Sequence, residues 1–377
     1  MQDGKIIAAW LFQKYEGGNA YGTGVVRQLN STWISTMVVY LEKRSDAPNL
    51  FAENGCRVEY LASKGAAKFF NPILIFKLAK FLRGSKVDIL HCHRHKAIFY
   101  GTLAAFIAKT PVVLAHVHGL NRTRTLFRRL SNSILLPSVT KLIAVSEAVK
   151  SDILASNPTI AADKVVTLLN SIEFPKYADV SITSNDARQL LGVPPDAFVF
   201  GTVGRLAPTK GQTHLVEAFA EVKKTIPNAR LVIVGSGPLK EKLEKQVAGL
   251  SIADSVIFTD FRGDVPQILR AFDCFVLPSI AEGMPGALLE AMAASRACIA
   301  SAVGGIPEVL TDSLGMLVAP RDTTGLQEAM MRCVNMPAEE RKALGKRARD
   351  HVERFHHQDR YAERLRQIYN DELTGDC

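Results

Sequence analysis

The chain has 377 residues, of which 47% are hydrophobic and 22% charged, and its formal net charge is +9. This length predicts two or three domains with a core each, and the composition is ordinary for a globular protein. The apolar run near Met1 is too short for a signal peptide, and no run reaches the roughly 18 residues of a spanning helix. Six scattered cysteines without a Cys-x-x-Cys pattern indicate reduced, cytosolic thiols.

The positive charge is concentrated in the N-terminal half. Residues 1–180 carry 23 Lys and Arg against 12 Asp and Glu, whereas residues 181–377 carry 23 against 25. This asymmetry indicates an anionic partner for the first half, for which nucleic acid, an anionic membrane and a phosphorylated glycolipid are candidates. A solvated basic face is the alternative interpretation.

Short β-branched runs alternate with helical periods, as in parallel α/β sheets. In the first half we expect strands at 5–11, 37–41, 57–61, 88–91, 112–116, 141–145 and 165–170, and helices at 67–83, 97–109 and 146–156. Residues 171–195 lose the pattern and hold the linker, with a short helix at 184–191. In the second half we expect strands at 198–203, 230–234, 255–258, 274–277, 297–300 and 316–318, then helices from 323 to 372. Two doubly wound domains follow, with ligands beyond the carboxyl ends of the strands.

Glu282 and Glu290 flank a predicted helix start. The preceding strand ends at Leu277 and the helix begins near Pro285, so backbone N–H groups form an anion site there. Glu282 lies on the turn and Glu290 more than one helical turn downstream. A diphosphate at the helix start would therefore meet two acceptors for sugar hydroxyls, which indicates a nucleotide-sugar site.

A second loop, from Gly204 to Gly211, follows the first strand of the second half. Arg205 and Lys210 flank its Pro-containing turn, and two cations on a strand-to-helix loop suit a phosphate. An ordinary surface loop is the alternative for this pair alone.

In order and spacing, these motifs resemble the retaining glycosyltransferases of family 4. The resemblance covers nearly the whole chain, and it includes Gly204-Arg205 with Lys210-Gly211, Phe272-Asp273, Pro278-Ser279, Glu282-x7-Glu290 and Gly304-Gly305-Ile306-Pro307-Glu308. It implies the GT-B fold, an α/β architecture in which two Rossmann-like doubly wound domains face each other across a cleft. Residues 1–180 would form the acceptor-side domain and 181–355 the nucleotide-sugar domain, and the helix in 356–377 would cross back to the first domain.

The resemblance also implies roles for single residues of the second domain. Arg205 and Lys210 would hold the donor diphosphate, and Glu290 would bind the ribose. Glu282 would face the transferred sugar. Backbone groups of two further segments would line the donor, near the sugar at Gly283, Met284, Pro285 and Gly286 and near the base at Phe261 and Arg262. A helix-surface carboxylate is the alternative for Glu290.

The first domain matches less closely. Gly17-Gly18 resembles a glycine loop that lets backbone approach the diphosphate. His91, His93 and His95 alternate and would share one face of a strand, where a metal site is an alternative that lacks a carboxylate partner. The resemblance instead favours His118 as a contact for the donor sugar that stabilises the transition state, with His116 as the alternate. Histidines satisfied by the fold are the remaining alternative.

Two basic stretches are candidates for the acceptor side. Residues 64–86 mix Lys and Arg with Phe, Ile and Leu, which predicts either a membrane-surface helix or a crossover helix with a cationic outer face. Residues 121–130 carry four arginines directly after His118-Gly119, which favours an anionic acceptor or, equally, a solvated loop helix.

The resemblance therefore predicts a retaining, metal-independent glycosyltransferase that needs no cofactor. Its donor would be a UDP-sugar and its acceptor a glycan or glycolipid of lipopolysaccharide or other surface polysaccharide synthesis. We expect a cytoplasmic enzyme, with peripheral contact to the inner face of the cell membrane as a hypothesis and without nucleic acid as a partner. A sugar-nucleotide 2-epimerase of the same fold and a non-catalytic nucleotide-sugar binding protein are the alternatives.

Overall fold

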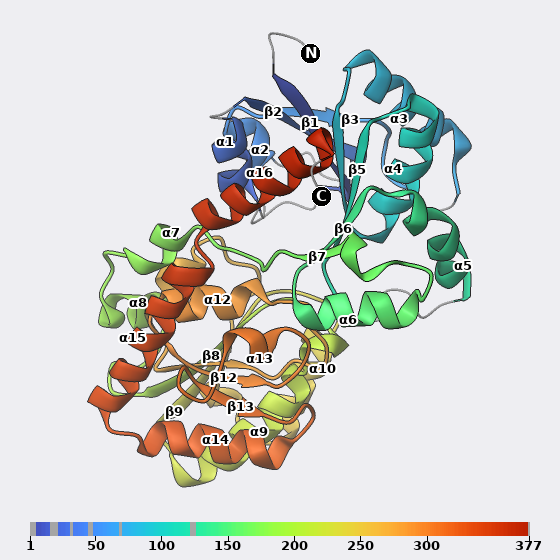
Figure 1. The fold of residues 1–377 in the computed structure, drawn as a ribbon. Helices are drawn as coiled ribbons and strands as arrows, with labels where there is room; N and C mark the ends of the chain where they lie inside the picture. The colour runs from blue at the N-terminus through green and yellow to red at the C-terminus, as the bar shows by residue number, and fades with distance from the viewer. Residues whose placement is uncertain are drawn as a thin grey trace. The chain divides into compact units, whose positions relative to one another are not determined.

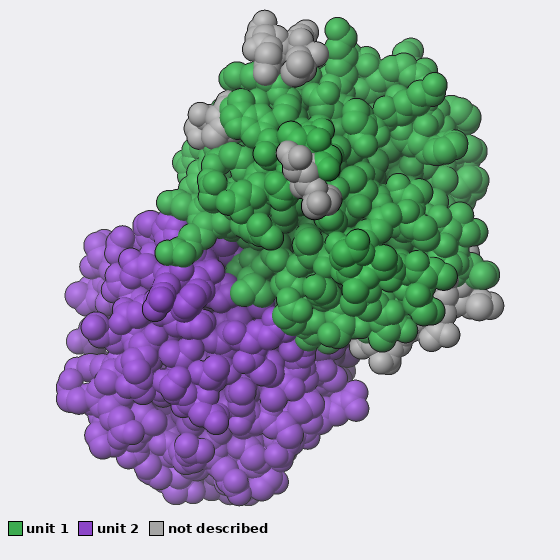
Figure 2. Space-filling model, in the orientation of Figure 1, with its two compact units in different colours: residues 1–170, 358–377 green, residues 171–357 purple. Residues whose placement is uncertain are grey.

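The computed structural model describes residues 5–15, 22–30, 33–43, 48–67, 70–120 and 126–375, which form two compact units. Unit 1 holds residues 1–170 and 358–377, and unit 2 holds residues 171–357 (Figure 2). The predicted boundary after residue 180 thus falls inside unit 2. The reason is that helix α7 (Phe174–Ala178), in a segment without clear periodicity, packs against helix α12 (Gly286–Ala293) of unit 2.

Unit 1 is built on a parallel sheet of seven strands in the order β3-β2-β1-β4-β5-β6-β7 (Figure 1). Its strands are β1 (Ile6–Lys14), β2 (Ile34–Glu42), β3 (Arg57–Tyr60), β4 (Ile89–His93), β5 (Val112–Val117), β6 (Lys141–Ala144) and β7 (Val165–Thr167). Its described α-helices are α1 (Thr23–Asn30), α2 (Leu50–Glu53), α3 (Pro72–Gly84), α4 (Arg94–Ala108), α5 (Leu126–Leu135), α6 (Glu147–Ser156) and α16 (Gln358–Thr374).

Unit 2 is built on a parallel sheet of six strands in the order β10-β9-β8-β11-β12-β13. Its strands are β8 (Phe198–Val203), β9 (Ala229–Val234), β10 (Val256–Phe258), β11 (Cys274–Leu277), β12 (Ala297–Ser301) and β13 (Met316–Val318). Besides α7 and α12, its helices are α8 (Ser184–Leu190), α9 (Gln212–Thr225), α10 (Lys240–Gly249), α11 (Val265–Leu269), α13 (Ile306–Val309), α14 (Thr323–Asn335) and α15 (Ala338–Phe355). Each predicted strand of both halves is confirmed.

Both faces of the unit 1 sheet are covered, and the two-residue alternation of its strands decides which side chain meets which helix. Trp10 and Tyr40 share a buried core with α1 and α16. On the other face, a Cβ on Gly101 of α4 would lie 2.3 Å from Cys92 Sγ, so α4 packs tightly on β4.

The C-terminal helix α16 is part of unit 1. Trp10 Nε1 donates a hydrogen bond to Tyr369 Oη at 2.8 Å, and Lys141 Nζ lies 2.9 Å from Glu372 Oε1. No described helix is both long and apolar enough to cross a membrane.

Helix α3 begins later than predicted. The helix was expected from residue 67 but starts at Pro72, because Asn71 caps it by accepting a hydrogen bond from the Leu74 N–H at 3.2 Å. Asparagine before proline is a strong start signal, since proline lacks only an N–H that the first turn leaves unpaired.

Strand order reverses at one point in each sheet, between β1 and β4 in unit 1 and between β8 and β11 in unit 2. Beside such a reversal, the loops leave toward opposite faces and open a crevice at the carboxyl edge of the sheet. The loops after these strands are therefore where a ligand site is expected in each unit.

Candidate functional site

The loops after β8 and β11 lie together at the reversal point of unit 2. The Ile280 N–H donates to the Thr209 carbonyl at 2.8 Å and joins the second loop to a 3₁₀ turn on the first, Pro208–Lys210. Gly211 permits this approach, because its φ is +66° and a Cβ there would lie 2.0 Å from the Pro278 carbonyl oxygen. The fold thus brings Lys210 to Glu282 and keeps Arg205 on the same loop as Lys210.

Lys210 and Glu282 form an ion pair between these loops. Lys210 Nζ lies 2.6 Å from Glu282 Oε1, and Ser279 Oγ donates to the same oxygen at 2.6 Å. The side chains are only 24% and 10% exposed, so the pair is held in one geometry. Lys210 keeps further N–H groups for an anion, and Glu282 keeps a second oxygen for hydroxyl donors.

Arg205 is an exposed cation on the first loop. Its backbone is fixed, since Gln212 Nε2 donates to its carbonyl at 3.0 Å and the next N–H, of Leu206, donates to the Ser236 carbonyl at 2.9 Å. Within the described part of the chain, no carboxylate pairs with the guanidinium. Its planar fork of N–H donors is therefore available to a diphosphate.

Helix α12 directs its N-terminus at the same place. Pro285 occupies the N-cap position without a side-chain hydrogen bond, and the first turn holds no acidic residue. The helix therefore begins where it was predicted, with first-turn N–H groups that no described side chain caps. The Gly305 N–H donates to the Gly283 carbonyl at 2.8 Å and fixes the loop that precedes the helix.

Glu290 lies farther along α12 and faces α7. The Tyr177 hydroxyl donates a hydrogen bond to its carboxylate, and Lys176 lies nearby. Burial raises the pKa of Glu290, and the Tyr177 hydrogen bond and the Lys176 charge offset this only in part. This environment does not match the alternative of a helix-surface carboxylate.

Phe261 and Arg262 follow β10 at the same edge of the sheet. The Gly235 N–H donates to the Asp260 carbonyl at 2.7 Å, so this loop is joined to the loop after β9. Arg262 makes two hydrogen bonds to Asp264, at 2.8 and 2.6 Å. These contacts fix the backbone that was predicted to contact a nucleotide base.

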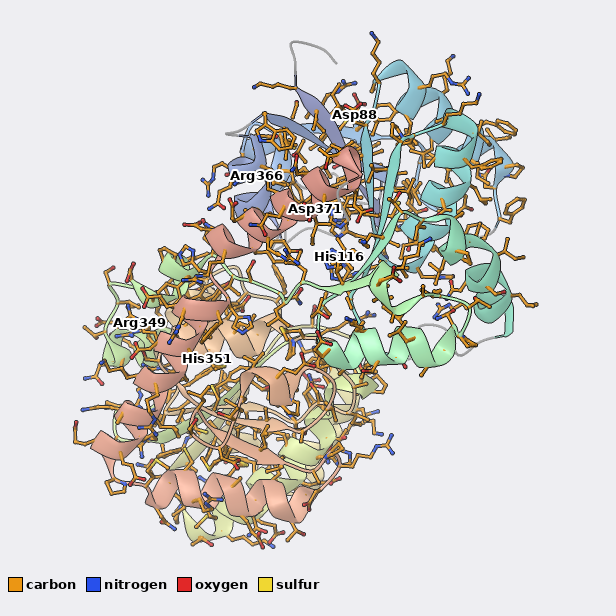
Figure 3. The ribbon with its side chains drawn as sticks, viewed as in Figure 1. Asp88, His116, Arg349, His351, Arg366 and Asp371 are labelled. Atoms are coloured by element: carbon orange, nitrogen blue, oxygen red, sulfur yellow. The ribbon has the colours of Figure 1, made fainter. Side chains whose placement is uncertain are left out.

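The corresponding edge of unit 1 carries four histidines. His91 and His93 lie in the last three residues of β4, His116 is the last residue but one of β5, and His118 follows that strand (Figure 3 labels His116). His93 Nδ1 lies 3.1 Å from His118 Nε2, and His91 Nε2 lies 3.1 Å from His116 Nδ1. The expectation that His95 shares this face is wrong, because the chain turns into α4 at Arg94.

A chain of hydrogen bonds from α16 determines how these histidines are protonated. The indole of Trp10 can only donate, so the Tyr369 oxygen accepts from it and gives its own proton to His91 Nδ1 at 2.8 Å. His91 then donates from Nε2 to His116, whose own Nε2 has no partner among the described residues. Burial lowers the pKa of His116 to about 3 and that of His91 well below its ordinary value, so the chain is neutral.

The ring nitrogens of His91, His93 and His116 lie within 4.8 Å of one another, which is a spacing that a metal ion could bridge. However, both nitrogens of His91 are bonded, to Tyr369 and His116, and no carboxylate belongs to this described group. His91 is therefore not available as a ligand for a buried cation, and no negative charge in this group would compensate the charge of the cation. The arrangement fits a hydrogen-bonded stack rather than a metal centre.

Comparison with known families agrees with both halves of this architecture. Residues 34–174 match the family model described as Glycosyltransferase Family 4, and residues 184–351 match the model described as Glycosyl transferases group 1. The chain belongs to the family 4 glycosyltransferases.

Two named relatives match most of the length of this family 4 glycosyltransferase. The UDP-Gal:alpha-D-GlcNAc-diphosphoundecaprenol alpha-1,3-galactosyltransferase of Escherichia coli is 29% identical over 74% of this chain and 78% of that protein. The capsular polysaccharide biosynthesis glycosyltransferase CapM of Staphylococcus aureus is 27% identical over 78% and 80%.

Solved structures share the fold of this glycosyltransferase at low sequence identity. Anabaena Alr3699/HepE in complex with UDP and glucose has a TM-score of 0.82 and 20% identity, covering 96% of this chain and 99% of that chain. Sucrose-phosphate synthase of Thermosynechococcus elongatus has a TM-score of 0.81 and 20% identity, covering 99% and 100%. The predicted GT-B class, with two Rossmann-like doubly wound domains, is confirmed.

Several contacts of the candidate sites could not be predicted from the sequence of this glycosyltransferase. Tyr177 precedes Glu290 by more than a hundred positions, and Tyr369 follows His91 at a separation of 278 residues, so no local pattern links either pair.

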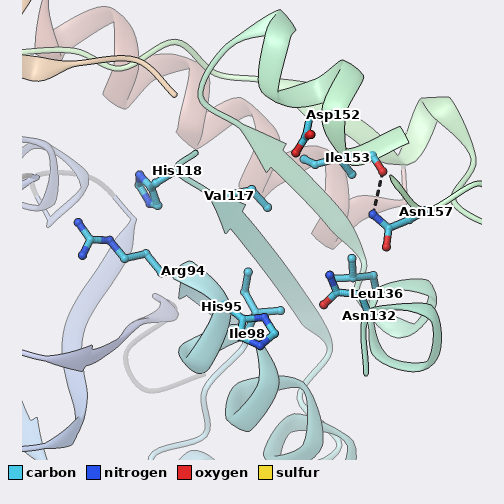
Figure 4. Close-up of a pocket in the computed structure, with 10 residues that line it drawn as sticks. All are labelled: Arg94, His95, Ile98, Val117, His118, Asn132, Leu136, Asp152, Ile153 and Asn157. Atoms are coloured by element: carbon cyan, nitrogen blue, oxygen red, sulfur yellow. Dashed lines mark hydrogen bonds between the residues drawn. The ribbon is translucent and has the colours of Figure 1, made fainter. Parts of the chain in front are cut away.

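Arg94 is a further residue that the sequence did not single out. Its φ is +70°, which is unusual for a residue with a side chain. It lines a small pocket of about 30 Å³ together with His118 and Asp152 (Figure 4). Gly17 and Gly18 lie outside the described residues.

Proposed function

We propose that this glycosyltransferase moves a sugar from a UDP-sugar to a glycan or glycolipid acceptor with retention of anomeric configuration. One observation carries the proposal, which is the joined pair of loops that holds Arg205, Lys210 and the α12 N-terminus beside Glu282. The E. coli relative is named for UDP-Gal, and Alr3699/HepE was crystallised with UDP, which supports a uridine nucleotide.

The electrostatics of these loops suit the departure of a nucleoside diphosphate. When the bond between the anomeric carbon and the phosphate oxygen breaks, the sugar gains oxocarbenium character and the phosphate gains negative charge. Arg205, Lys210 and the N–H groups of α12 would stabilise that charge from fixed positions. The acceptor oxygen bonds to the anomeric carbon on the same face, and its proton passes to the leaving phosphate, so no enzyme base is required.

The remaining groups hold the donor. Glu282 accepts hydrogen bonds from the transferred sugar, and Glu290 accepts them from the ribose. The backbone at Phe261 and Arg262 contacts the base, and His118 is our candidate for contact with the sugar from unit 1. Because fixed cations supply the positive charge, we propose that neither a metal ion nor a cofactor takes part.

For the acceptor we propose a lipid-linked glycan of lipopolysaccharide or other surface polysaccharide synthesis. The E. coli relative is named for a diphosphoundecaprenol acceptor and the S. aureus relative for capsular polysaccharide synthesis. The basic composition of residues 1–180 suits an acceptor that carries phosphate.

The proposal is tested by thermal-shift titration with UDP-sugars and GDP-mannose, followed by NMR of the products with a lipid-diphosphate glycan. We expect a UDP-sugar to stabilise the wild type and the Lys242→Ala control, but Arg205→Ala and Lys210→Ala much less. The product should keep the anomeric configuration of the donor, and chelator should leave its rate unchanged. Conversion of the donor without acceptor would indicate an epimerase, and donor binding without turnover would indicate a binding protein. Either result, or no stabilisation by any donor, would reject the proposal.

A further inference from the structure

Helices α3 and α4 present large apolar side chains to solvent. Phe70, directly before α3, is 65% exposed, and Ile73 and Phe76 of α3 are 69% and 62% exposed. Phe106 of α4 is 83% exposed. We call the surface formed by these four residues with Lys77 and Lys80 the α3–α4 face.

The core of unit 1 does not use these side chains. Helix α3 packs inward through Leu74, Ile75 and Leu78, and helical geometry directs Ile73, Phe76 and the two lysines to the opposite side. The helix is therefore a crossover helix, as one interpretation predicted, but its outer side is apolar as well as cationic. A surface helix that serves only to cover a sheet gains nothing from exposed phenylalanine.

The two helices form one continuous surface. They lie side by side in unit 1 (Figure 1), and the ring of Phe70 meets that of Phe99 on α4 at a centroid distance of 6.2 Å. At the other end, the Arg83 guanidinium donates to the Ile107 carbonyl at 2.6 Å. The exposed side chain of Phe106 is next to this contact in the chain, at the opposite end of the two helices from Phe70.

Cationic residues predominate in this region. Residues 60–146 contain 14 Lys and Arg but a single acidic residue, Asp88. The Asp88 carboxylate accepts a hydrogen bond from the Ile7 N–H at 2.8 Å, so it is engaged at the start of β1. Just outside this range, Glu59 pairs with Arg57, whose guanidinium lies 5.7 Å from the ring centroid of Phe81 on α3. Cations therefore outnumber acidic groups around the apolar side chains.

We propose that the α3–α4 face docks this enzyme on an anionic lipid bilayer. Phenylalanine and isoleucine side chains insert at the boundary of headgroups and acyl chains, while lysine ammonium groups meet lipid phosphates. Each lysine near such a surface strengthens partitioning roughly fivefold, and the effect falls off within a Debye length. A nucleic acid would match the charge but not the apolar side chains, and a lipid surface matches both.

Docking goes beyond the proposed function and does not rest on the identity of the donor. It would bring the enzyme to the surface where a lipid-linked acceptor resides.

Vesicle co-sedimentation of the full chain tests the proposal, with phosphatidylcholine vesicles that contain or lack phosphatidylglycerol. We expect binding to the anionic vesicles that weakens as salt is raised. Lys77→Glu/Lys80→Glu should reduce it at least ~20-fold, because two attractive charges become repulsive. Ile73→Ser/Phe76→Ser should reduce it roughly tenfold at any salt concentration, since the apolar contribution is not screened.

Matched controls lie on unit 2. Lys242→Glu/Lys245→Glu makes the same charge change on α10, and Leu190→Ser/Leu250→Ser removes two exposed leucines. Both control variants should bind vesicles as the wild type does. Equal binding to neutral vesicles, equal loss in the controls, or no binding at all would overturn the proposal. Self-association that Ile73→Ser/Phe76→Ser abolishes would assign the face to a second copy instead. Thermal shift with UDP-sugars should be unchanged in all four variants, so failure of docking and failure of the donor proposal are separable.

Discussion

In unit 2, the loops at the strand reversal carry charges that pair across the gap between them, Lys210 with Glu282, and leave Arg205 exposed. In unit 1, neighbouring strands β4 and β5 carry the neutral His91 and His116, which bond to each other, and His91 also bonds to Tyr369 of α16. One topology thus supports two kinds of polar cluster, one charged and partly solvated, the other neutral and buried.

The difference follows from the cost of desolvation. A charged pair keeps its charges only near water or within an ion pair, so Lys210 and Glu282 remain at a loop edge where a ligand can replace either partner. Neutral imidazoles can be buried at a much lower cost than charges, and their hydrogen bonds fix their orientation, so each lost bond is expensive. The charged cluster of unit 2 can therefore exchange its ion pair for contacts with a ligand, whereas the histidines of unit 1 are held in a fixed arrangement.

The largest expected effect is on the charged cluster. Lys210→Ala or Arg205→Ala should lower kcat by about 10²–10³-fold, because each removes fixed positive charge from the departing phosphate. Steady-state kinetics with a UDP-sugar measures this, with Lys242→Ala on α10 as a matched control. Rates like those of the wild type in both variants would show that the cluster does not act on the leaving group.

Tyr369→Phe should disrupt the buried hydrogen-bond chain of unit 1. The variant leaves the Trp10 N–H and His91 Nδ1 without their shared partner, and each unpaired group costs ~1–3 kcal/mol. We expect the free energy of unfolding to fall by roughly 2–6 kcal/mol in denaturant titrations. Trp10→Phe removes one of the two groups that Tyr369→Phe leaves unpaired. The double variant should therefore lose less stability than the sum of the two single variants, and strictly additive losses would refute the coupling between Trp10 and Tyr369.

Acid should destabilise unit 1 through the same histidines. The pKa of His116 is lowered to about 3 by burial, so the unfolded chain takes up a proton on this residue near pH ~6.5 while the folded chain does not. Stability is therefore complete above about pH 6.5 and is lost as the pH falls, by about 2 kcal/mol at pH ~5 for this residue. Denaturant titrations across this range should show a smaller pH dependence in His116→Asn, and an unchanged slope would contradict the assignment.

The smallest expected effect concerns Glu290. Glu290→Gln should raise the KM for the donor roughly tenfold with little change in kcat, since a weaker acceptor would bind ribose less tightly without touching the reacting centre. Tyr177→Phe, which leaves the carboxylate but removes its hydroxyl partner, is the matched comparison and should change KM less. A kcat loss that dominates in Glu290→Gln would move this residue into the chemical step.

The sequence by itself determined both sheets and the charged cluster. Parallel strands buried on both faces read as continuous β-branched runs, and the glycine turns with Arg205, Lys210, Glu282 and Glu290 are local in the chain. The start of α3 at Pro72 is also indicated by a local signal, the Asn71-Pro72 pair, although the predicted start at residue 67 did not use it.

Only the tertiary structure decided what these groups touch. The ion pair of Lys210 with Glu282 needs two loops that meet because Gly211 admits a carbonyl oxygen, and the histidine chain needs α16 to return to unit 1. Contacts across such separations leave no periodic signal, since any distant segment can supply the partner. The exposure of Phe76 and Phe106 could not be predicted from the sequence either. Apolar residues occur on more than one side of these helices, so their pattern does not show which side packs against the sheet.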